Sequence, residues 1–189
     1  FTAFTHEPAI ALAEKLLEVL PGNFSKIFYT DDGSTATEVA IKLALQYWKN
    51  VGNNNRNKIL AFHNSYHGDT FGAMSVSERG VYTSAYNDKL FDVLFIDTPD
   101  SHNIGQLKNE IEKYKDEIAC FIYEPLLQGA GGMLMYDADG LNNLLHYLKK
   151  EKIICIADEV LTGFYRTGKF FAGDYMQEKA DIICLSKAL

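Results

Sequence analysis

The chain has 189 residues, of which 47% are hydrophobic and 13% aromatic, so it can bury one substantial core and fits a single domain. Its 18 basic and 25 acidic side chains give a net charge of −7 without a sustained basic run, which argues against nucleic acid or an anionic membrane surface as a partner. No apolar run approaches the roughly 20 residues of a membrane span, and no charged leader precedes an apolar segment. A cytoplasmic protein that acts on small molecules is therefore expected.

The three cysteines, Cys120, Cys155 and Cys184, lie inside or beside apolar runs. Cysteines in such runs usually behave as small hydrophobic residues. Because their spacing does not match a set of metal ligands, we expect buried, reduced thiols and no metal site.

The first third of the chain predicts a helix, a strand and a second helix. Apolar residues at helical spacing indicate the first helix over residues 5–20. Residues 26–30 (KIFYT) predict a strand, and a second helix follows the turn at Gly33. The backbone amides of Gly33, Ser34 and Thr35 would then lie at a helix N-terminus and hold a phosphate dianion. A strand, a glycine turn and a hydroxyl cap are, however, also an ordinary way to start a helix.

Strands and helices alternate in the middle of the chain. Strands are indicated by short apolar runs rich in β-branched and aromatic side chains, and helices by apolar residues at helical spacing. The predicted strands are residues 58–63, 92–96 and 119–123, and the predicted helices are residues 104–114 and 141–150.

Chemically useful side chains follow two of these strands. Tyr66 comes just after the first, where an exposed ring needs a flat group to cover it, although tyrosines packed in a core are commoner. The neighbouring His67 is expected to support the turn through hydrogen bonds. Glu124 follows the third strand and leads into a glycine-rich loop at residues 128–133. The glycines there do not form a dinucleotide fingerprint, and they allow positive φ angles and close approach of the backbone to a ligand.

Two apolar runs near the end of the chain, residues 153–156 and 182–185, are short and apolar on both faces, which is typical of buried parallel strands. Asp158 follows the first run and Lys187 follows the second. Ligands of open parallel sheets bind outside the carboxyl ends of the strands, so this carboxylate and this amine would face one crevice. The pair suits pyridoxal phosphate, because an amine can bond to its aldehyde and a carboxylate can keep its pyridine nitrogen protonated.

The positions of these candidate residues also predict the fold class. Each lies just past the end of a predicted strand, and the strands alternate with helices, which indicates an α/β fold with a predominantly parallel sheet flanked by helices. Parallel strands bring all of these ends to one rim of the sheet. Other interpretations stay open for single residues: Asp158 and Glu159 could form a metal or salt-bridge pair, and Lys187 could be a helix N-terminal cation.

Residues 153–189 resemble the class III pyridoxal-phosphate aminotransferases, as do the strings THEPAI at residues 5–10, YHGDTFGAMSV at 66–76 and QGAGGM at 128–133. The resemblance covers essentially all 189 residues. It implies that residues 1–189 form a single, partial domain, the large cofactor-binding domain of fold type I pyridoxal-phosphate enzymes. The small C-terminal domain of such enzymes is expected to lie outside this sequence.

The resemblance implies a role for each site residue. Lys187 is expected to be catalytic and to bond the cofactor, while Tyr66 and Val160 cover opposite faces of the cofactor ring. Gln128 is expected near the substrate, together with Tyr66. Tyr165 stands where glycine commonly precedes the arginine, here Arg166, which leaves the shape of that loop open. The cofactor-binding residues expected are Gly33, Ser34, Thr35, Tyr66, His67, Glu124, Asp158, Val160 and Lys187.

The activity that the resemblance implies is an amino transfer from S-adenosylmethionine to 7-keto-8-aminopelargonate, giving 7,8-diaminopelargonate in biotin biosynthesis. It also implies a homodimer with a shared active site, so that this piece alone is expected to be nearly inactive. An ω-amino acid aminotransferase or a glutamate-semialdehyde aminomutase of the same class stays open, because the same cofactor residues serve all of them. A non-catalytic α/β phosphate-binding module is the third alternative.

Overall fold

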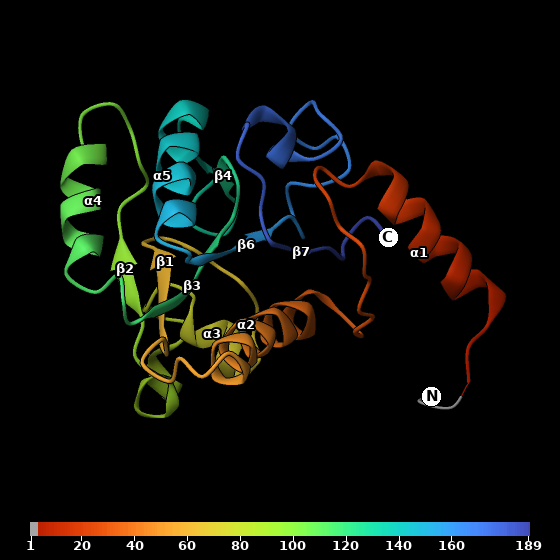
Figure 1. Ribbon diagram of the computed structural model, residues 1–189, viewed down its shortest axis with the longest axis horizontal. Coiled ribbons are helices and arrows are strands. Elements are labelled where there is room, and N and C mark those ends of the chain that lie inside the picture. The colour runs from red at the N-terminus through yellow and green to blue at the C-terminus, as the bar shows by residue number, and fades with distance from the viewer. Residues whose placement is uncertain (1–3) are drawn as a thin grey trace.

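Parallel strands form the central sheet of the computed structural model, which describes residues 4–189 (Figure 1). The order across the sheet is β2-β1-β3-β6-β7, and each neighbouring pair is parallel. The α/β fold with a parallel sheet that the sequence predicts is therefore confirmed. The strands are β1 (Lys58–Phe62), β2 (Leu94–Ile96), β3 (Ile118–Tyr123), β6 (Ile154–Asp158) and β7 (Ile182–Cys184).

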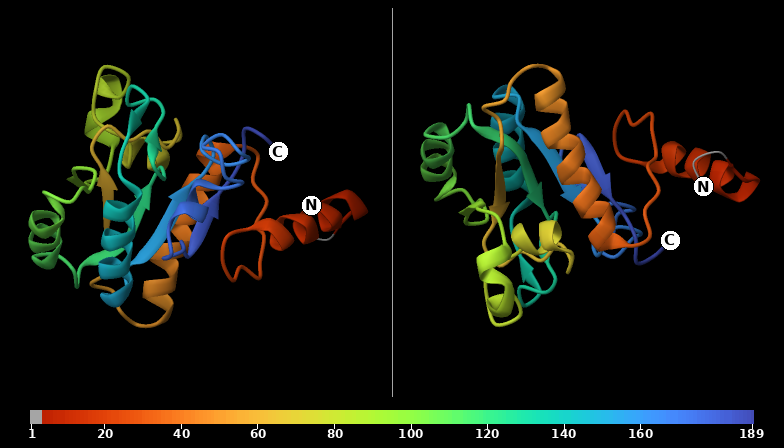
Figure 2. Two further views of the ribbon diagram at one scale, coloured as in Figure 1. Left: turned by 90° about the horizontal axis from the view of Figure 1, so that it is seen from above. Right: turned by 90° about the horizontal axis from the view of Figure 1, so that it is seen from below.

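Helices cover both faces of this sheet. Helices α4 (Ile104–Glu112) and α5 (Ala138–Lys150) lie on one face, and α2 (Gly33–Asn50) lies on the other with α3 (Phe71–Ser75) beside it (Figure 1). Helix α1 (Glu7–Val19) projects away from this body, as the two views of Figure 2 show. No helix among residues 4–189 is long and apolar enough to cross a membrane.

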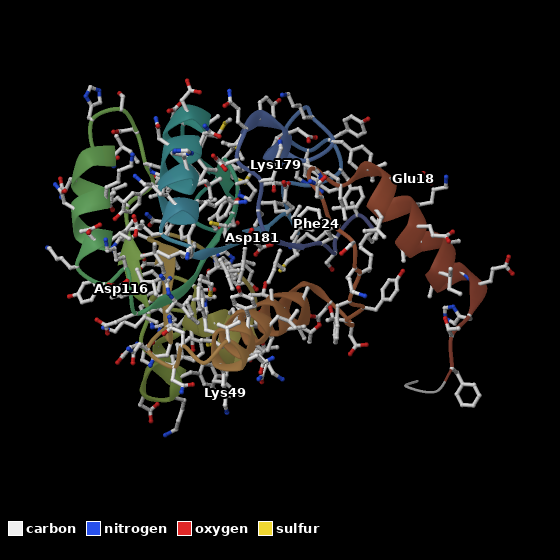
Figure 3. All side chains as sticks on the ribbon, viewed as in Figure 1. Glu18, Phe24, Lys49, Asp116, Lys179 and Asp181 are labelled. Carbon is white, nitrogen blue, oxygen red and sulfur yellow. The ribbon has the colours of Figure 1, made fainter. Side chains whose placement is uncertain are left out.

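Short elements lie in the connections. The glycine-rich loop forms an antiparallel hairpin of β4 (Leu127–Gln128) and β5 (Leu134–Met135), and two 3-10 helices are η1 (Ser84–Lys89) and η2 (Ala172–Tyr175). Side chains crowd the space between sheet and helices, whereas those of α1, with Glu18 near its end, reach into open space (Figure 3). Within α1 only Leu16 is buried.

The apolar strands divide their side chains between two cores, because successive side chains point to opposite faces of a sheet. In β3, where all six residues are buried, Phe121 and Tyr123 face α4 and α5, whereas Cys120 and Ile122 face α2. All three cysteines are free and buried, as the sequence predicts. Burial raises the pKa of the Cys120 thiol to about 12, so this thiol stays protonated and unreactive at neutral pH.

The prediction of a strand at residues 26–30 is wrong. This segment lies outside the sheet between α1 and α2, with Phe28 69% and Tyr29 49% exposed. A strand needs a partner for its backbone groups, and no described strand lies beside these residues. The short apolar run therefore did not produce a strand, and α2 follows a loop.

Some boundaries also differ from the predicted ones. Helix α5 begins at Ala138, three residues before the predicted start, because the Asp137 carboxylate caps it by accepting a hydrogen bond from the Gly140 N–H at 2.7 Å. The hairpin, α3 and the 3-10 helices were not predicted, since they are too short to show periodicity.

Candidate active site

A cavity of about 410 Å³ lies at the carboxyl ends of the strands. Loops after β1, β3, β6 and β7 converge there, and the N-terminus of α2 closes one side. In chain order the connections leave β1 for β2 and return past β1 to β3, so the cavity lies beside the point where the strand order reverses. The predicted residues that line it are Gly33, Ser34, Tyr66, His67, Glu124, Asp158, Val160 and Lys187.

The first turn of α2 points backbone N–H groups at this cavity. The N–H of Gly33 has no hydrogen-bond partner among the described residues, and the N–H of Ser34 makes only a weak interaction with the Asp32 carboxylate. They lie at the positive end of an 18-residue helix, which is a favourable place for an anion.

Thr35 does not line the cavity, because it completes the cap of α2. Its N–H donates to Asp32 Oδ1 at 2.8 Å, and its hydroxyl accepts from the N–H of Asp32 at 3.0 Å. The N–H and the hydroxyl of Thr35 also both donate to the Asp32 carboxylate, and these two hydrogen bonds lower the pKa of that carboxyl. The structure thus places Thr35 behind the two amides that it helps to orient.

The turn after β1 approaches α2 very closely. Gly68 has a φ of +129°, and a Cβ on it would lie 2.4 Å from Ser34 Oγ and 2.7 Å from Ser34 Cα. The N–H of Asp69 donates to the same Ser34 hydroxyl at 3.1 Å. Glycine is therefore required at position 68 for both its φ and the space it leaves.

Asp158 and His67 form a buried pair at the floor of the cavity. Nδ1 of His67 lies 2.8 Å from Asp158 Oδ2, with the side chains 0% and 6% exposed. Because a carboxylate can only accept, Nδ1 carries the proton of this hydrogen bond. The second carboxylate oxygen of Asp158 accepts from the N–H of Val160 at 3.1 Å.

Glu124 links two walls of the cavity. Its Oε2 accepts from the N–H of Tyr66 at 3.2 Å, and its Oε1 accepts from the N–H of Gly129 at 3.1 Å. Burial raises the pKa of this carboxyl, and the nearby Asp158 charge acts in the same direction. Gln128, by contrast, is buried outside the cavity lining, where its side-chain amide donates to the carbonyl of His63 at 2.7 Å.

An aromatic ring and a primary amine face the cavity opening. The Tyr66 side chain is partly exposed, and its hydroxyl donates to Asp69 Oδ2 at 2.9 Å. Partial burial, with the Asp69 contact second, raises the pKa of Tyr66 to about 12, so its hydroxyl stays protonated. Lys187 lies in the exposed loop after β7, and its amine makes no hydrogen bond or ion pair with any described residue.

Glu159, which the sequence interpretation left as a possible partner of Asp158, belongs to a separate network. Its buried carboxylate accepts hydrogen bonds from the N–H groups of Ala172 and Gly173 at 2.9 and 2.7 Å and from the Thr162 hydroxyl at 2.8 Å. The two adjacent carboxylates share no hydrogen-bond partner, since Asp158 bonds to His67 and Val160. Glu159 fixes the loop after β6, a role that no periodic pattern in the sequence predicted.

Tyr165 adopts the backbone conformation that glycine prefers. Its φ is +66°, and the preceding Phe164 has a φ of +58°. The N–H of Tyr165 donates to the Phe170 carbonyl at 3.1 Å, and the two rings meet edge to face with centroids 4.9 Å apart. The loop thus forms a left-handed turn at Phe164 and Tyr165.

These residues bring together helix N-terminal amides, a buried carboxylate, an aromatic face and a primary amine. A model of the class III aminotransferase family matches residues 1–189, and the chain belongs to this family. Its parallel sheet and flanking helices are those of fold type I pyridoxal-phosphate-dependent transaminases.

The relatives within this family include one named enzyme. Adenosylmethionine-8-amino-7-oxononanoate aminotransferase of Synechococcus elongatus is 43% identical over 100% of this chain and 47% of its own length. The crystal structure of the enzyme of that name from Methanocaldococcus jannaschii is 36% identical, with a TM-score of 0.91 over 97% of this chain and 43% of that chain. An amine transaminase from an uncultivated Pseudomonas species, solved in its PLP-bound form, is 33% identical, with a TM-score of 0.89 over 98% of this chain and 45% of that chain. The chain spans about half the length of the curated relatives it matches.

Proposed function

We propose that the protein carrying this chain is a pyridoxal-phosphate-dependent aminotransferase of biotin biosynthesis. It would move an amino group from S-adenosylmethionine to 7-keto-8-aminopelargonate and release 7,8-diaminopelargonate. The observation that carries the proposal is the single cavity that joins the Lys187 amine, the Asp158 carboxylate and the N-terminal amides of α2. The names of its relatives support this substrate pair.

The polar residues of the cavity fit pyridoxal phosphate. The N–H groups of Gly33 and Ser34, with the positive end of α2, would hold the phosphate. Asp158, held by two donors, would keep the pyridine nitrogen protonated. When bound, the cofactor supplies an electron sink for the carbon that loses or gains the amino group.

The remaining cavity residues would orient the reactants and move the proton. The rings and methyl groups of Tyr66 and Val160 would cover the two faces of a flat ring. Lys187 Nζ is a primary amine without an ion-pair partner, so it can bond to an aldehyde and later act as a base. In that role it would take the proton from the amine-bearing carbon of the donor in the first half-reaction and deliver a proton to the former carbonyl carbon of the acceptor in the second. Gln128 would act on the substrate indirectly, by fixing the glycine-rich hairpin through the His63 carbonyl.

The proposal extends to the whole protein. Residues 1–189 would be part of the large cofactor-binding domain, and a second domain would come from the other half of a protein as long as its relatives. A cytoplasmic homodimer with a shared active site fits the exposed apolar side chains of α1, Ile10, Leu12 and Val19, which a second copy could cover.

The test uses the full-length protein loaded with pyridoxal phosphate. S-adenosylmethionine alone should convert the bound cofactor to its amine form, seen as a loss of the aldehyde absorbance. Adding 7-keto-8-aminopelargonate should restore that absorbance and give 7,8-diaminopelargonate by mass spectrometry. Conversion of the bound cofactor by an ω-amino acid but not by S-adenosylmethionine would instead identify another class III aminotransferase. The similarity to an amine transaminase supports this alternative. Failure to take up the cofactor would favour a non-catalytic module.

A further inference from the structure

Ser77 is a buried hydroxyl just beyond α3, 4% exposed and outside the cavity lining. Its Oγ accepts a hydrogen bond from the N–H of His67 at 2.9 Å and donates one to the carbonyl of Ala73 at 2.9 Å. A serine hydroxyl has one proton to donate, and Ser77 donates it in the hydrogen bond to the Ala73 carbonyl. Toward the N–H of His67 the hydroxyl can therefore only accept. Its orientation is thereby fixed.

The His67 ring has one hydrogen-bond partner among the described residues. Its side chain is fully buried, and Nδ1 is held by Asp158 Oδ2 at 2.8 Å. Nε2 is buried and has no hydrogen-bond partner among the described residues. With one hydrogen bond to the ring, the distance from His67 to Asp158 is set by the position of the His67 backbone, which the Ser77 hydroxyl holds.

We infer that Ser77 is a positioning residue for Asp158, which it reaches through the His67 backbone and ring. The inference deepens the proposed function, since it rests on Asp158 as the partner of the cofactor ring. Without the hydroxyl, the buried His67 N–H would lack an acceptor, and the turn would shift to find one. The ring would then move away from Asp158.

Several polar groups surround the hydrogen bond between His67 and Asp158. Glu124 at the end of β3 and the Tyr66 hydroxyl face the same cavity, Cys184 lies on the adjacent β7, and Lys187 lies on the following loop. Burial, with the Asp158 charge acting in the same direction, raises the pKa of the Glu124 carboxyl. Among the described residues, His67 Nδ1 is the one side-chain donor to Asp158, so its hydrogen bond fixes the orientation of that carboxylate.

Ser75 offers a matched control. It is also buried, its hydroxyl donates to the Phe71 carbonyl at 2.6 Å, and it accepts from the N–H of Phe91 at 3.2 Å. Both serines therefore bond back to a carbonyl four residues earlier and accept from a distant backbone N–H. Only Ser77 touches His67, so Ser75→Ala removes the same kinds of hydrogen bond without affecting the pair.

The first experiment needs no cofactor. In the full-length apoprotein labelled with 15N, Ser77→Ala should speed solvent exchange of the His67 backbone N–H and of its Nδ1–H by about tenfold or more, the factor expected for loss of one hydrogen bond. Ser75→Ala should leave both rates unchanged. If Ser77→Ala does not fold, Ser77→Cys keeps the volume with a weak acceptor and should show the same direction. Equal exchange rates in the Ser77 and Ser75 variants would overturn the inference.

The second experiment uses the loaded enzyme. Ser77→Ala should lower kcat by about tenfold with little change in KM, as expected when transition-state stabilisation is lost, and Ser77→Thr should restore it. Equal losses of kcat in Ser77→Ala and Ser75→Ala would show a merely structural role and overturn the inference. If the wild-type protein shows no cofactor absorbance, the proposed function fails, and the exchange rates of the apoprotein still decide the role of Ser77.

Discussion

Each oxygen of the Asp158 carboxylate accepts one hydrogen bond, one from the His67 ring and one from the N–H of Val160. Both partners are donors, so the side chain at position 158 must accept hydrogen bonds at both of its terminal atoms. An uncharged amide at this position could accept one of these hydrogen bonds, and its NH₂ group would then face the other donor.

Asp158→Asn should therefore lower transamination by at least about 100-fold, because the amide cannot keep a pyridine nitrogen protonated. Bonding of the cofactor to Lys187 should persist, since it does not need that charge. The measurements are kcat/KM in the full-length protein and the amount of cofactor fixed by borohydride. Asp116→Asn, at an exposed carboxylate just before β3 and outside the cavity lining (Figure 3), should change neither. Near-normal turnover of Asp158→Asn would remove Asp158 from its proposed role.

Lys187 can be tested by where the cofactor is bonded. Borohydride reduction of the loaded protein should fix the cofactor on the peptide that contains Lys187, and Lys187→Ala and Lys187→Arg should both lose the adduct, because only a primary amine can form the bond. Lys169→Ala should keep the adduct, since Lys169 donates to the Asp174 carbonyl elsewhere. An adduct on Lys42 or Lys169 would show that the site is wrongly assigned.

We expect the substitution of glycine by alanine to have opposite effects on stability at positions 68 and 105. Gly68→Ala should destabilise the protein by about 1–3 kcal/mol, because position 68 has a positive φ and the added methyl group would overlap Ser34. Gly105→Ala, in α4 with open space around it, should stabilise by roughly 0.5–1 kcal/mol. Urea unfolding measures both. Phosphate affinity should also fall for Gly68→Ala alone, and a neutral Gly68→Ala would contradict the close packing of this turn against α2.

The end of β3 connects two other parts of the fold, because Glu124 just after it joins the loop after β1 to the β4–β5 hairpin. The raised pKa of Glu124 means that the folded state binds its proton more tightly than the unfolded chain. Its contribution to stability is therefore fully present below the ordinary value of 4.5 and is lost as pH rises through the higher pKa of the folded state.

Glu124→Gln should remove this pH dependence. The free energy of unfolding of the wild type relative to Glu124→Gln should be greatest at pH 4 and should decrease toward pH 7, as measured by urea titrations of the full-length protein. Glu110→Gln, at an exposed position of α4, is the control for removing a surface charge and should show no such trend. A difference between wild type and Glu124→Gln that grows with pH would contradict the raised pKa.

The elements also show what the sequence could predict. The strands β1, β3, β6 and β7 were predicted because their runs are apolar on both faces, which is a local property. Residues 26–30 have the same local character and form no strand, since pairing depends on which backbone lies alongside. Thr35 shows the same limit within the site: a hydroxyl at a helix start is visible in the sequence, but whether it caps the helix or faces a ligand depends on the Asp32 side chain. Ser77 gave no signal, because its partner is ten residues away in an irregular turn.

At the scale of the whole molecule, this chain aligns with 47% of the length of its Synechococcus relative. A protein ending at Leu189 should have less than about 1% of the turnover of the full-length enzyme, because the substrate would be bound from one side of an open cavity whose Lys187 is exposed. Parallel assays of both proteins, with cofactor uptake measured alongside, check this. Robust turnover by the shorter protein would show that residues 1–189 hold the complete site.

The two cores that share β3 have different consequences for the cavity. Helix α2 rests on Cys120 and Ile122 and carries at its N-terminus the amides proposed to bind the phosphate. Phe121 and Tyr123 support α4 and α5, which contribute no lining residue. Conservative substitutions along β3 should all lower stability, but only every second one should loosen the grip on the cofactor phosphate. In a saturation scan of β3, the affinity for the cofactor would thus fall at alternate positions, whereas the stability of the fold would fall at all of them. One face of the strand would then affect stability alone, and the other face would affect both stability and cofactor binding.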